Sequence, residues 1–129
     1  MAYTHKVGTI YTSDAGTIST VTATYTADGE VGYDGTLTTA TTNQEVDFAF
    51  TVANVKACIL YSSTALTVKT NNSTTPQETI TLVAGVPVVW TNDDHFAIPF
   101  AGNVTKLYLT NNSGSTASIK MRVLTDITP

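Results

Sequence analysis

The residues best suited to proton transfer in this sequence are its two histidines, His5 and His95. A hydrolytic triad needs a nucleophile, an imidazole that takes its proton and an acid that orients the imidazole. Neither histidine is accompanied by a Gly-x-Ser-x-Gly motif. His5 follows closely on the amino terminus beside Lys6, where we expect a surface or rim position and assign it no role. The sequence therefore predicts no nucleophilic catalytic site.

A cation site is the second chemistry to consider, because His95 follows three oxygen-bearing side chains in Asn92-Asp93-Asp94-His95-Phe96. Carboxylate, amide and imidazole groups all bind divalent cations. The spacing, however, fits neither a twelve-residue calcium loop nor a zinc site. We therefore expect a solvated loop with a turn-forming acidic pair, and no metal-ligating residue.

Three carboxylates lie within seven positions, at Asp28, Glu30 and Asp34, and paired carboxylates are the machinery of glycosidases. General acid catalysis needs one carboxyl group whose pKa is raised by apolar burial, whereas these residues lie in a polar, glycine-rich stretch. Two turns, at Asp28-Gly29-Glu30 and at Asp34-Gly35, explain the same residues. We predict that the protein is not an enzyme and holds no cofactor.

Aromatic residues gather in the last third of the chain, at Trp90, Phe96, Phe100 and Tyr108. Stacked rings could form a sugar-binding platform, which would require Trp90, Phe96 or Tyr108 to be exposed on one face. The same rings could instead pack in the core or between subunits. We favour packing, because Val88 and Trp90 share one face of a strand whose neighbours are apolar.

The lone cysteine and the asparagine sequons carry no functional prediction. Cys58 has no partner for an internal disulfide, and its apolar neighbours indicate a small buried residue rather than a reactive thiol. Four N-x-S/T sequons occur in segments expected to be turns, and no glycan is predicted for them. They begin at Asn71, Asn72, Asn103 and Asn111.

Composition indicates which elements position these residues. The chain has 129 residues, a size that fits one domain, and we expect residues 1–129 to form it. Charged residues make up 12% of the sequence, about half the usual share, and threonine makes up roughly a fifth. Threonine is β-branched and polar and suits the solvated face of a strand, so the composition favours an all-β protein.

Alternation of apolar and polar residues predicts the strands one by one. Val21, Ala23 and Tyr25 alternate with threonines and are expected to point inward, and Val46, Phe48, Phe50 and Val52 repeat the pattern. The segment 57–61 is continuously apolar, as in a central strand covered on both faces. Further strands are expected at 3–11, 66–70, 79–83, 87–91, 106–110 and 119–123.

Turn signals then predict how the strands pair. Ala84-Gly85-Val86 is expected to join two strands in a tight hairpin, and Asn111–Ser115 to join the last two strands in the most secure hairpin of the chain. No window has helical periodicity, so at most one helical turn is expected. Eight to ten short strands at this spacing predict a single antiparallel β-sandwich, jelly-roll-like.

Charge restricts the possible partners. The net charge is −4 and the six basic residues are scattered, whereas binding to a nucleic-acid backbone needs clustered lysine and arginine. No apolar run reaches the length of a membrane-spanning helix, and residues 1–12 lack the pattern of a signal peptide. We expect no nucleic-acid partner, no membrane contact and no export signal.

Five segments of the carboxy-terminal half, which runs from about Ala65 to Pro129, have a familiar pattern: 66–71, 76–82, 86–90, 104–114 and 119–126. On these segments the chain resembles a family of small tailed-bacteriophage virion proteins of the capsid decoration, or cement, type. The resemblance covers about half the chain and transfers no functional residue. It implies a non-enzymatic β-sandwich made in the host cytoplasm and carried on the capsid exterior, where it binds and stabilises the major capsid protein lattice.

The resemblance also implies an oligomer, and a homotrimer on local three-fold axes is our first expectation. Two alternatives stay open at this point. One is a carbohydrate-binding module, and the other is a head-fibre or tail receptor-binding component.

Overall fold

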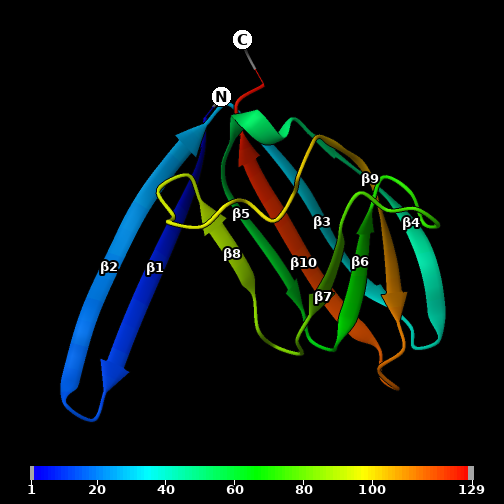
Figure 1. The fold of residues 1–129 in the computed structure, drawn as a ribbon, viewed down its shortest axis with the longest axis horizontal. Helices are drawn as coiled ribbons and strands as arrows, with labels where there is room; N and C mark the ends of the chain where they lie inside the picture. Colours follow the sequence, from blue (N-terminus) through cyan, green and yellow to red (C-terminus); the bar gives the residue numbers. More distant parts are fainter. Residues whose placement is uncertain (1, 128–129) are drawn as a thin grey trace.

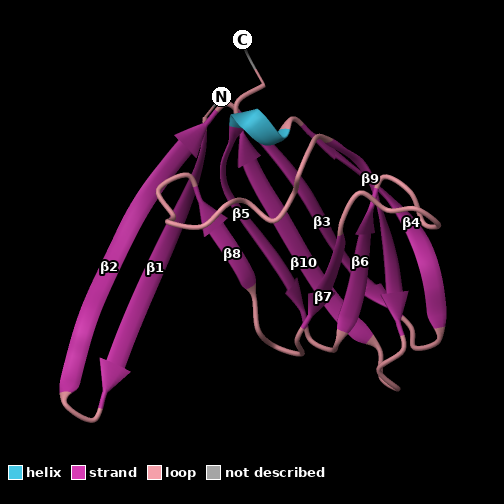
Figure 2. Cartoon of the chain, viewed as in Figure 1, coloured by secondary structure: helices cyan, strands magenta, loops and turns pink. Residues whose placement is uncertain are grey.

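The computed structural model describes residues 2–127, and within them the chain forms ten β-strands and one short 3-10 turn (Figure 1). Figure 2 shows that strands and loops make up nearly all of the molecule. The strands are β1 (Tyr3–Ser13), β2 (Gly16–Ala27), β3 (Gly29–Leu37), β4 (Thr41–Phe50), β5 (Val55–Ser62), β6 (Leu66–Thr70), β7 (Thr79–Leu82), β8 (Val88–Thr91), β9 (Val104–Asn111) and β10 (Ala117–Thr125). The 3-10 turn, Val52–Asn54, separates β4 from β5.

Eight of these strands form a jelly roll. One sheet has the order β3-β10-β5-β8, and the other has the order β4-β9-β6-β7. All pairs within the two sheets are antiparallel. Two four-stranded sheets built from eight strands that cross repeatedly between them are the jelly-roll arrangement. The predicted all-β sandwich is confirmed.

The core lies between the two sheets and follows the predicted alternation. In β10, Ile119, Met121 and Val123 are fully buried, whereas Lys120 faces outward. Leu107 and Leu109 of β9 cover them from the opposite sheet. Burying one such side chain is worth about 1.5–3 kcal/mol relative to leaving it exposed, so this interior supplies the main stabilisation of the sandwich.

Three phenylalanines close one part of this core. The rings of Phe48 and Phe50 lie 5.9 Å apart, those of Phe50 and Phe100 lie 5.1 Å apart, and both pairs meet edge to face. Phe48 and Phe50 point inward, as the alternation predicts. Val52, predicted to continue that strand, lies instead in the 3-10 turn, although it still packs against the core.

Both predicted hairpins are wrong. β7 pairs with β6 and β8 pairs with β5, so Ala84-Gly85-Val86 connects the two sheets. Likewise β9 pairs with β4 and β6, whereas β10 pairs with β3 and β5, so Asn111–Ser115 crosses from one sheet to the other. A tight turn reverses the chain whether the returning strand pairs with the preceding strand in one sheet or joins the opposite sheet. Only the packing of the whole sandwich decides whether the returning strand pairs in the same sheet.

The predicted turn at Asp34-Gly35 is also wrong, because both residues lie within β3. The glycines of this strand accommodate neighbouring side chains rather than a chain reversal. A Cβ atom on Gly35 would lie 2.5 Å from the Tyr33 hydroxyl, and one on Gly32 would lie 3.0 Å from Arg122 Cδ. The predicted turn at Asp28 does occur, between β2 and β3.

β1 and β2 lie outside both sandwich sheets and pair only with each other. They form a long antiparallel hairpin that stands off to one side of the sandwich (Figure 1). We call β1, β2 and the turn that joins them the arm. The sandwich itself therefore occupies the chain from Gly29 onward, and the predicted sandwich did not anticipate this separate arm.

Candidate functional site: the arm and the groove beside it

The two faces of the arm differ in chemistry. The register pairs His5 with Tyr25, Val7 with Ala23 and Thr9 with Val21, so these side chains share one face. The opposite face carries pairs such as Lys6 with Thr24 and Gly8 with Thr22. Because side chains alternate along a strand, most threonines lie on one face of the arm and most apolar residues on the other. Ile10, which is 73% exposed, is an exception on the threonine face.

The base of the arm packs on the outer face of the β3-β10-β5-β8 sheet. Ala27, Ala57 and Leu124 form a small buried cluster there, and Tyr25 packs against it. The Tyr25 hydroxyl lies 3.2 Å from Thr91 Oγ1 and donates across 3.0 Å to Asp93 Oδ2. The apolar side of the arm thus faces the sandwich at its base. Of the segment 57–61, which was expected to be covered on both faces, Ala57 is covered by the arm, whereas Ile59 and Tyr61 on the same face are only half-buried.

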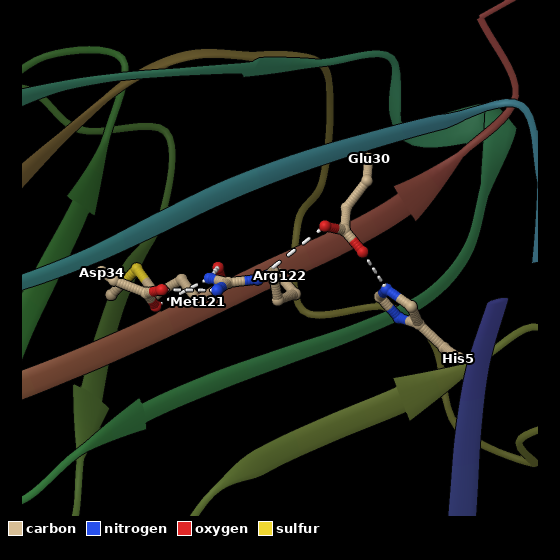
Figure 3. A network of polar contacts seen from close by, with 5 residues as sticks. All are labelled: His5, Glu30, Asp34, Met121 and Arg122. Atoms are coloured by element: carbon tan, nitrogen blue, oxygen red, sulfur yellow. Dashed lines mark hydrogen bonds and ion pairs between the residues drawn. The ribbon is translucent and has the colours of Figure 1, made fainter. Parts of the chain in front are cut away.

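A polar network holds the same base from the side of β1 (Figure 3). His5 Nε2 lies 2.6 Å from Glu30 Oε2, and the ring nitrogen donates because an ionised carboxylate can only accept. Glu30 Oε1 in turn lies 3.9 Å from Arg122 Nε. The His5 side chain is 16% exposed, so of the predicted surface or rim position it occupies the rim.

Arg122 is the centre of this network. Its Nη1 and Nη2 atoms donate to the two carboxylate oxygens of Asp34, across 2.8 and 2.5 Å, and Nη1 also donates to the Met121 carbonyl. The guanidinium lies across β3 at Gly32, its partner in the register, where a larger residue would displace it. The hydrogen bonds and charge of Arg122 hold the pKa of Asp34 below its usual range.

A groove of about 600 Å³ opens between β1 and the sandwich. The arm contributes residues 5–9 to one wall. The other wall includes Ala57, Ile59 and Val89 on the outer sheet face, with Arg122 at one side. Val89 is 41% exposed and Ile59 half-buried, so this wall presents apolar surface to solvent. Its volume and its partly apolar lining fall within the range of ligand-binding clefts in proteins.

Beyond the groove, most of the described side chains of the distal arm are exposed. Tyr11 is 63% and Val21 57% exposed, although both belong to the face that packs on the sandwich at the base. The prediction that Val21 points into a core is therefore wrong, whereas Ala23 and Tyr25 are partly buried. Between Gly8 and Thr22 the arm carries one charged side chain, Asp14 at the tip.

The loop considered as a cation site has structural partners instead. Asp94 accepts hydrogen bonds from the Thr91 backbone amide and hydroxyl, and Asp93 accepts one from Tyr25. His95 is exposed in the same loop. Among residues 2–127, the structure contains no cluster of three histidine, cysteine or acidic side chains that could hold a metal ion.

The three carboxylates that were considered as a glycosidase site also have hydrogen-bond partners. Glu30 and Asp34 form the arm network, and Asp28 Oδ1 accepts a hydrogen bond from the Ile127 amide across 2.6 Å. A glycosidase would need one carboxyl group with a raised pKa. The Asp34 pKa is shifted in the opposite direction.

The aromatic residues do not share one exposed face. Phe100 is buried in the core, and Trp90 packs against the core while its Nε1 donates to the Phe96 carbonyl across 2.8 Å. Tyr108 lies in the opposite sheet, where its hydroxyl donates to Glu45. Phe96, in a loop, is 82% exposed. Trp90 and Phe100 therefore serve packing of the core, and the aromatic residues form no stacked platform.

Cys58 is buried, and three of the sequon asparagines, Asn71, Asn103 and Asn111, form hydrogen bonds within the fold. Burial raises the pKa of the Cys58 thiol to about 12, which leaves it protonated and unreactive at neutral pH. Asn71 bridges the loop after β6 to the start of β9 through Asn103 and Thr105. Asn111 is fully buried and donates to the Leu37 carbonyl.

No helix among residues 2–127 is long or apolar enough to cross a membrane. Comparison of the chain with protein-family models, with curated proteins and with solved structures finds no match.

Sequence reasoning missed this site because its parts are distant in the chain. His5, Glu30 and Arg122 meet only when β1, β3 and β10 are assembled. One signal was available: Asp28-Gly29 directly follows an alternating strand and could have marked the hinge between a separate hairpin and the sandwich.

Proposed function

We propose that this chain is a non-enzymatic virion structural protein, a capsid decoration subunit that binds the major capsid protein lattice from outside and stabilises it. The observation that supports this most is the arm, a hairpin that projects from the sandwich with apolar side chains exposed over its distal half. Contact with neighbouring molecules would cover it.

The fold supports the proposal by analogy. Jelly rolls occur in viral capsid and lectin domains, among others, so the architecture is compatible with the role without requiring it. The resemblance of residues 65–129 to small phage virion proteins points the same way. That segment begins just before β6 and includes β6, β9 and β10, three of the four interior strands of the two sheets.

The outer face of the β4-β9-β6-β7 sheet suits contact with a protein lattice. Thr67, Thr81 and Thr110 lie on it, and Lys106 pairs with Glu45 across 3.2 Å. Threonine loses little hydration free energy on burial compared with an unpaired lysine or glutamate. Such a face can pack against another protein at a low desolvation cost.

Repetition supplies the affinity in this proposal. A subunit that associates into a homotrimer can contact three capsid proteins at once, and the second and third contacts form at a high effective concentration. Weak individual interfaces then suffice. Trimers on local three-fold axes are the arrangement we propose.

Binding to shells tests the proposal directly. Particles of the encoding phage assembled without this protein are mixed with purified chain, sedimented and heated. The proposal predicts saturable co-sedimentation at a fixed ratio to capsid protein, and genome release at a higher temperature than from undecorated particles. An unrelated β-sandwich of similar charge serves as the control and should stay in the supernatant. A chain that also stays there at every concentration contradicts the proposal.

A further inference from the structure

β2 has one free edge along its whole length. Within residues 2–127 it pairs with β1 alone, so about half of its backbone amides and carbonyls point to the side where no strand lies. In Figure 1 that edge faces away from the sandwich, whereas β1 lies on the side of the groove. A free edge is a template for another strand, and proteins that stay single protect their edges against such pairing.

The other edge strands of the described chain carry such protection. β7 and β8 are only four residues long. β4 carries Glu45 and Asp47, and two register shifts interrupt its pairing. β3 carries Glu30 and Asp34, and β1 carries Lys6. Short length, charged side chains and bulges are the usual means of keeping an edge unpaired.

β2 has none of these features over most of its length. Residues 19–27 include no charged residue, no proline and no glycine, and they pair with β1 in an unbroken register. Five of these nine residues are β-branched, a type that favours strands. The register shift of the arm lies nearer its tip, between Tyr11 and Thr12. The sequence therefore leaves this edge open, whereas it protects the others.

We propose that the free edge of β2 is a self-association surface, on which β2 of a second copy pairs antiparallel and completes a four-stranded sheet of order β1-β2-β2-β1. The partner strand must itself have an unprotected edge, and within the described chain β2 has the one such edge. The contact joins the same surface of two identical chains about a two-fold axis, which is the commonest symmetry of homo-oligomers.

The side chains of β2 suit this pairing. When the two-fold axis passes through Ala23, residues 19–27 of the two copies overlap in full, Thr22 lies opposite Thr24, and Val21 lies opposite Tyr25. Pairs of threonines, and pairs of an aromatic with a β-branched side chain, stabilise antiparallel sheets. No like charges face each other along the contact, because these residues carry none.

The contact goes beyond the proposed function and does not depend on it. A strand edge buries less area than a stable protein interface, so free chains associate through it only at high concentration. Subunits held on a lattice would present several such edges to one another, and the contact would then join neighbouring trimers at a high effective concentration. Its test uses the purified chain alone.

Charged side chains on β2 test the pairing. In the proposed register Thr22 of one copy lies diagonal to Thr22 and Thr26 of the other, within reach of long side chains. Both residues are exposed. The double variants Thr22→Lys with Thr26→Lys, and Thr22→Glu with Thr26→Glu, should therefore each repel copies of themselves. At about 1 mM chain, light scattering should give the wild type twice the mass of either variant.

Mixing separates the effect of charge from a failure to fold. An equimolar mixture of the lysine and glutamate variants should recover the wild-type mass, because unlike charges then face each other across the contact. β7 provides the matched control, since Thr79 and Thr81 are also exposed on an edge strand. Thr79→Lys with Thr81→Lys adds the same charge and should leave the mass at the wild-type value.

Hydrogen exchange gives a second measurement that needs no variant. Backbone amides on the free edge of β2 become hydrogen-bonded when the second copy adds. They should exchange several-fold more slowly at high than at low chain concentration, while exchange in β10 stays unchanged.

A wild-type chain with the same mass as both charge variants, and with exchange in β2 that does not depend on concentration, overturns the inference. An oligomer whose mass the β2 variants leave unchanged also overturns it, since the contact then lies on another surface. A mixture of the two variants that stays at the lower mass has the same consequence. A chain that doubles its mass as expected but fails to bind shells would overturn the proposed function and leave this inference in place.

Discussion

Arg122 shows how single residues in this protein hold elements together rather than perform chemistry. Its guanidinium lies over Gly32 and holds Asp34 and Glu30 on one side of the sheet, and Glu30 then binds His5 of the arm. From the sequence alone, Glu30 and Asp34 were explained as turn residues, and His5 was given no role. Residue type and spacing could not reveal the network, because its members lie on three strands that meet only in the folded chain.

The His5–Glu30 contact gives a first prediction. His5→Ala removes a mostly buried donor at the base of the arm and should loosen the arm without unfolding the sandwich. Hydrogen exchange of backbone amides should therefore become several-fold faster in β1 and β2 and stay unchanged in β10. Lys6→Ala, on the other face of the arm, is the control and should leave both unchanged. Equal acceleration in the arm and in β10 would show that His5 supports the whole fold.

Acid should weaken the same network through Asp34. Because Arg122 lowers the pKa of Asp34 in the folded state, the stabilisation is fully present above the ordinary value of 3.8 and is lost as the pH falls through the lower folded-state pKa. The difference in unfolding free energy between wild type and Asp34→Asn should therefore shrink below about pH 4. Chemical denaturation at a series of pH values measures it, and a constant difference would show that the ion pair contributes nothing.

Asn111 gives a prediction for the sandwich itself. Its side chain is fully buried and donates to the Leu37 and Ser115 carbonyls, while its Oδ1 accepts from Ser113. Asn111→Leu leaves these groups without partners and should cost about 1–3 kcal/mol of unfolding free energy for each buried group left unsatisfied. The exposed neighbour provides the control, since Asn112→Leu should change stability by less than about 0.5 kcal/mol. Equal effects in urea denaturation would contradict the assigned role.

At the scale of elements, the positions of strands followed from the sequence more reliably than their pairing. Alternation located β4, β9 and β10 because each has one buried and one solvated face. β3 was missed because four of its nine residues are glycine or aspartate, and these residue types are also common in turns. Pairing failed at both predicted hairpins, since a turn that crosses between sheets has the same local chemistry as one that stays within a sheet.

Leu124 links the arm to the sandwich and gives the prediction for these elements. It lies on the outer face of β10, fully buried beneath Ala27 and beside Ala57. Leu124→Ala should cost about 2–5 kcal/mol, as for other buried leucines, and should also release the arm. Limited proteolysis should then cut within β1 or β2 before the sandwich. Leu107→Ala, in the central core, should destabilise to a similar extent without early cleavage of the arm, and early cleavage in both variants would refute the link.

At the scale of the whole molecule, composition indicated the fold class. A threonine-rich, charge-poor chain with regularly spaced turns has few stable solutions other than two packed β-sheets, and the jelly roll is one of them. The separate arm was not predictable, because its alternating strands have the same pattern as strands that face a core. What distinguishes them is the surface that covers them, and the sandwich covers this hairpin only near its base.

The central claim is that this molecule is built to be completed by neighbours on a shell. Cryo-electron microscopy of the native particle tests it most directly. The account predicts density for the jelly roll at repeated positions on the capsid exterior, with each arm in contact with an adjacent molecule. Shells that carry no such density, with the chain recovered as a free monomer, would contradict it.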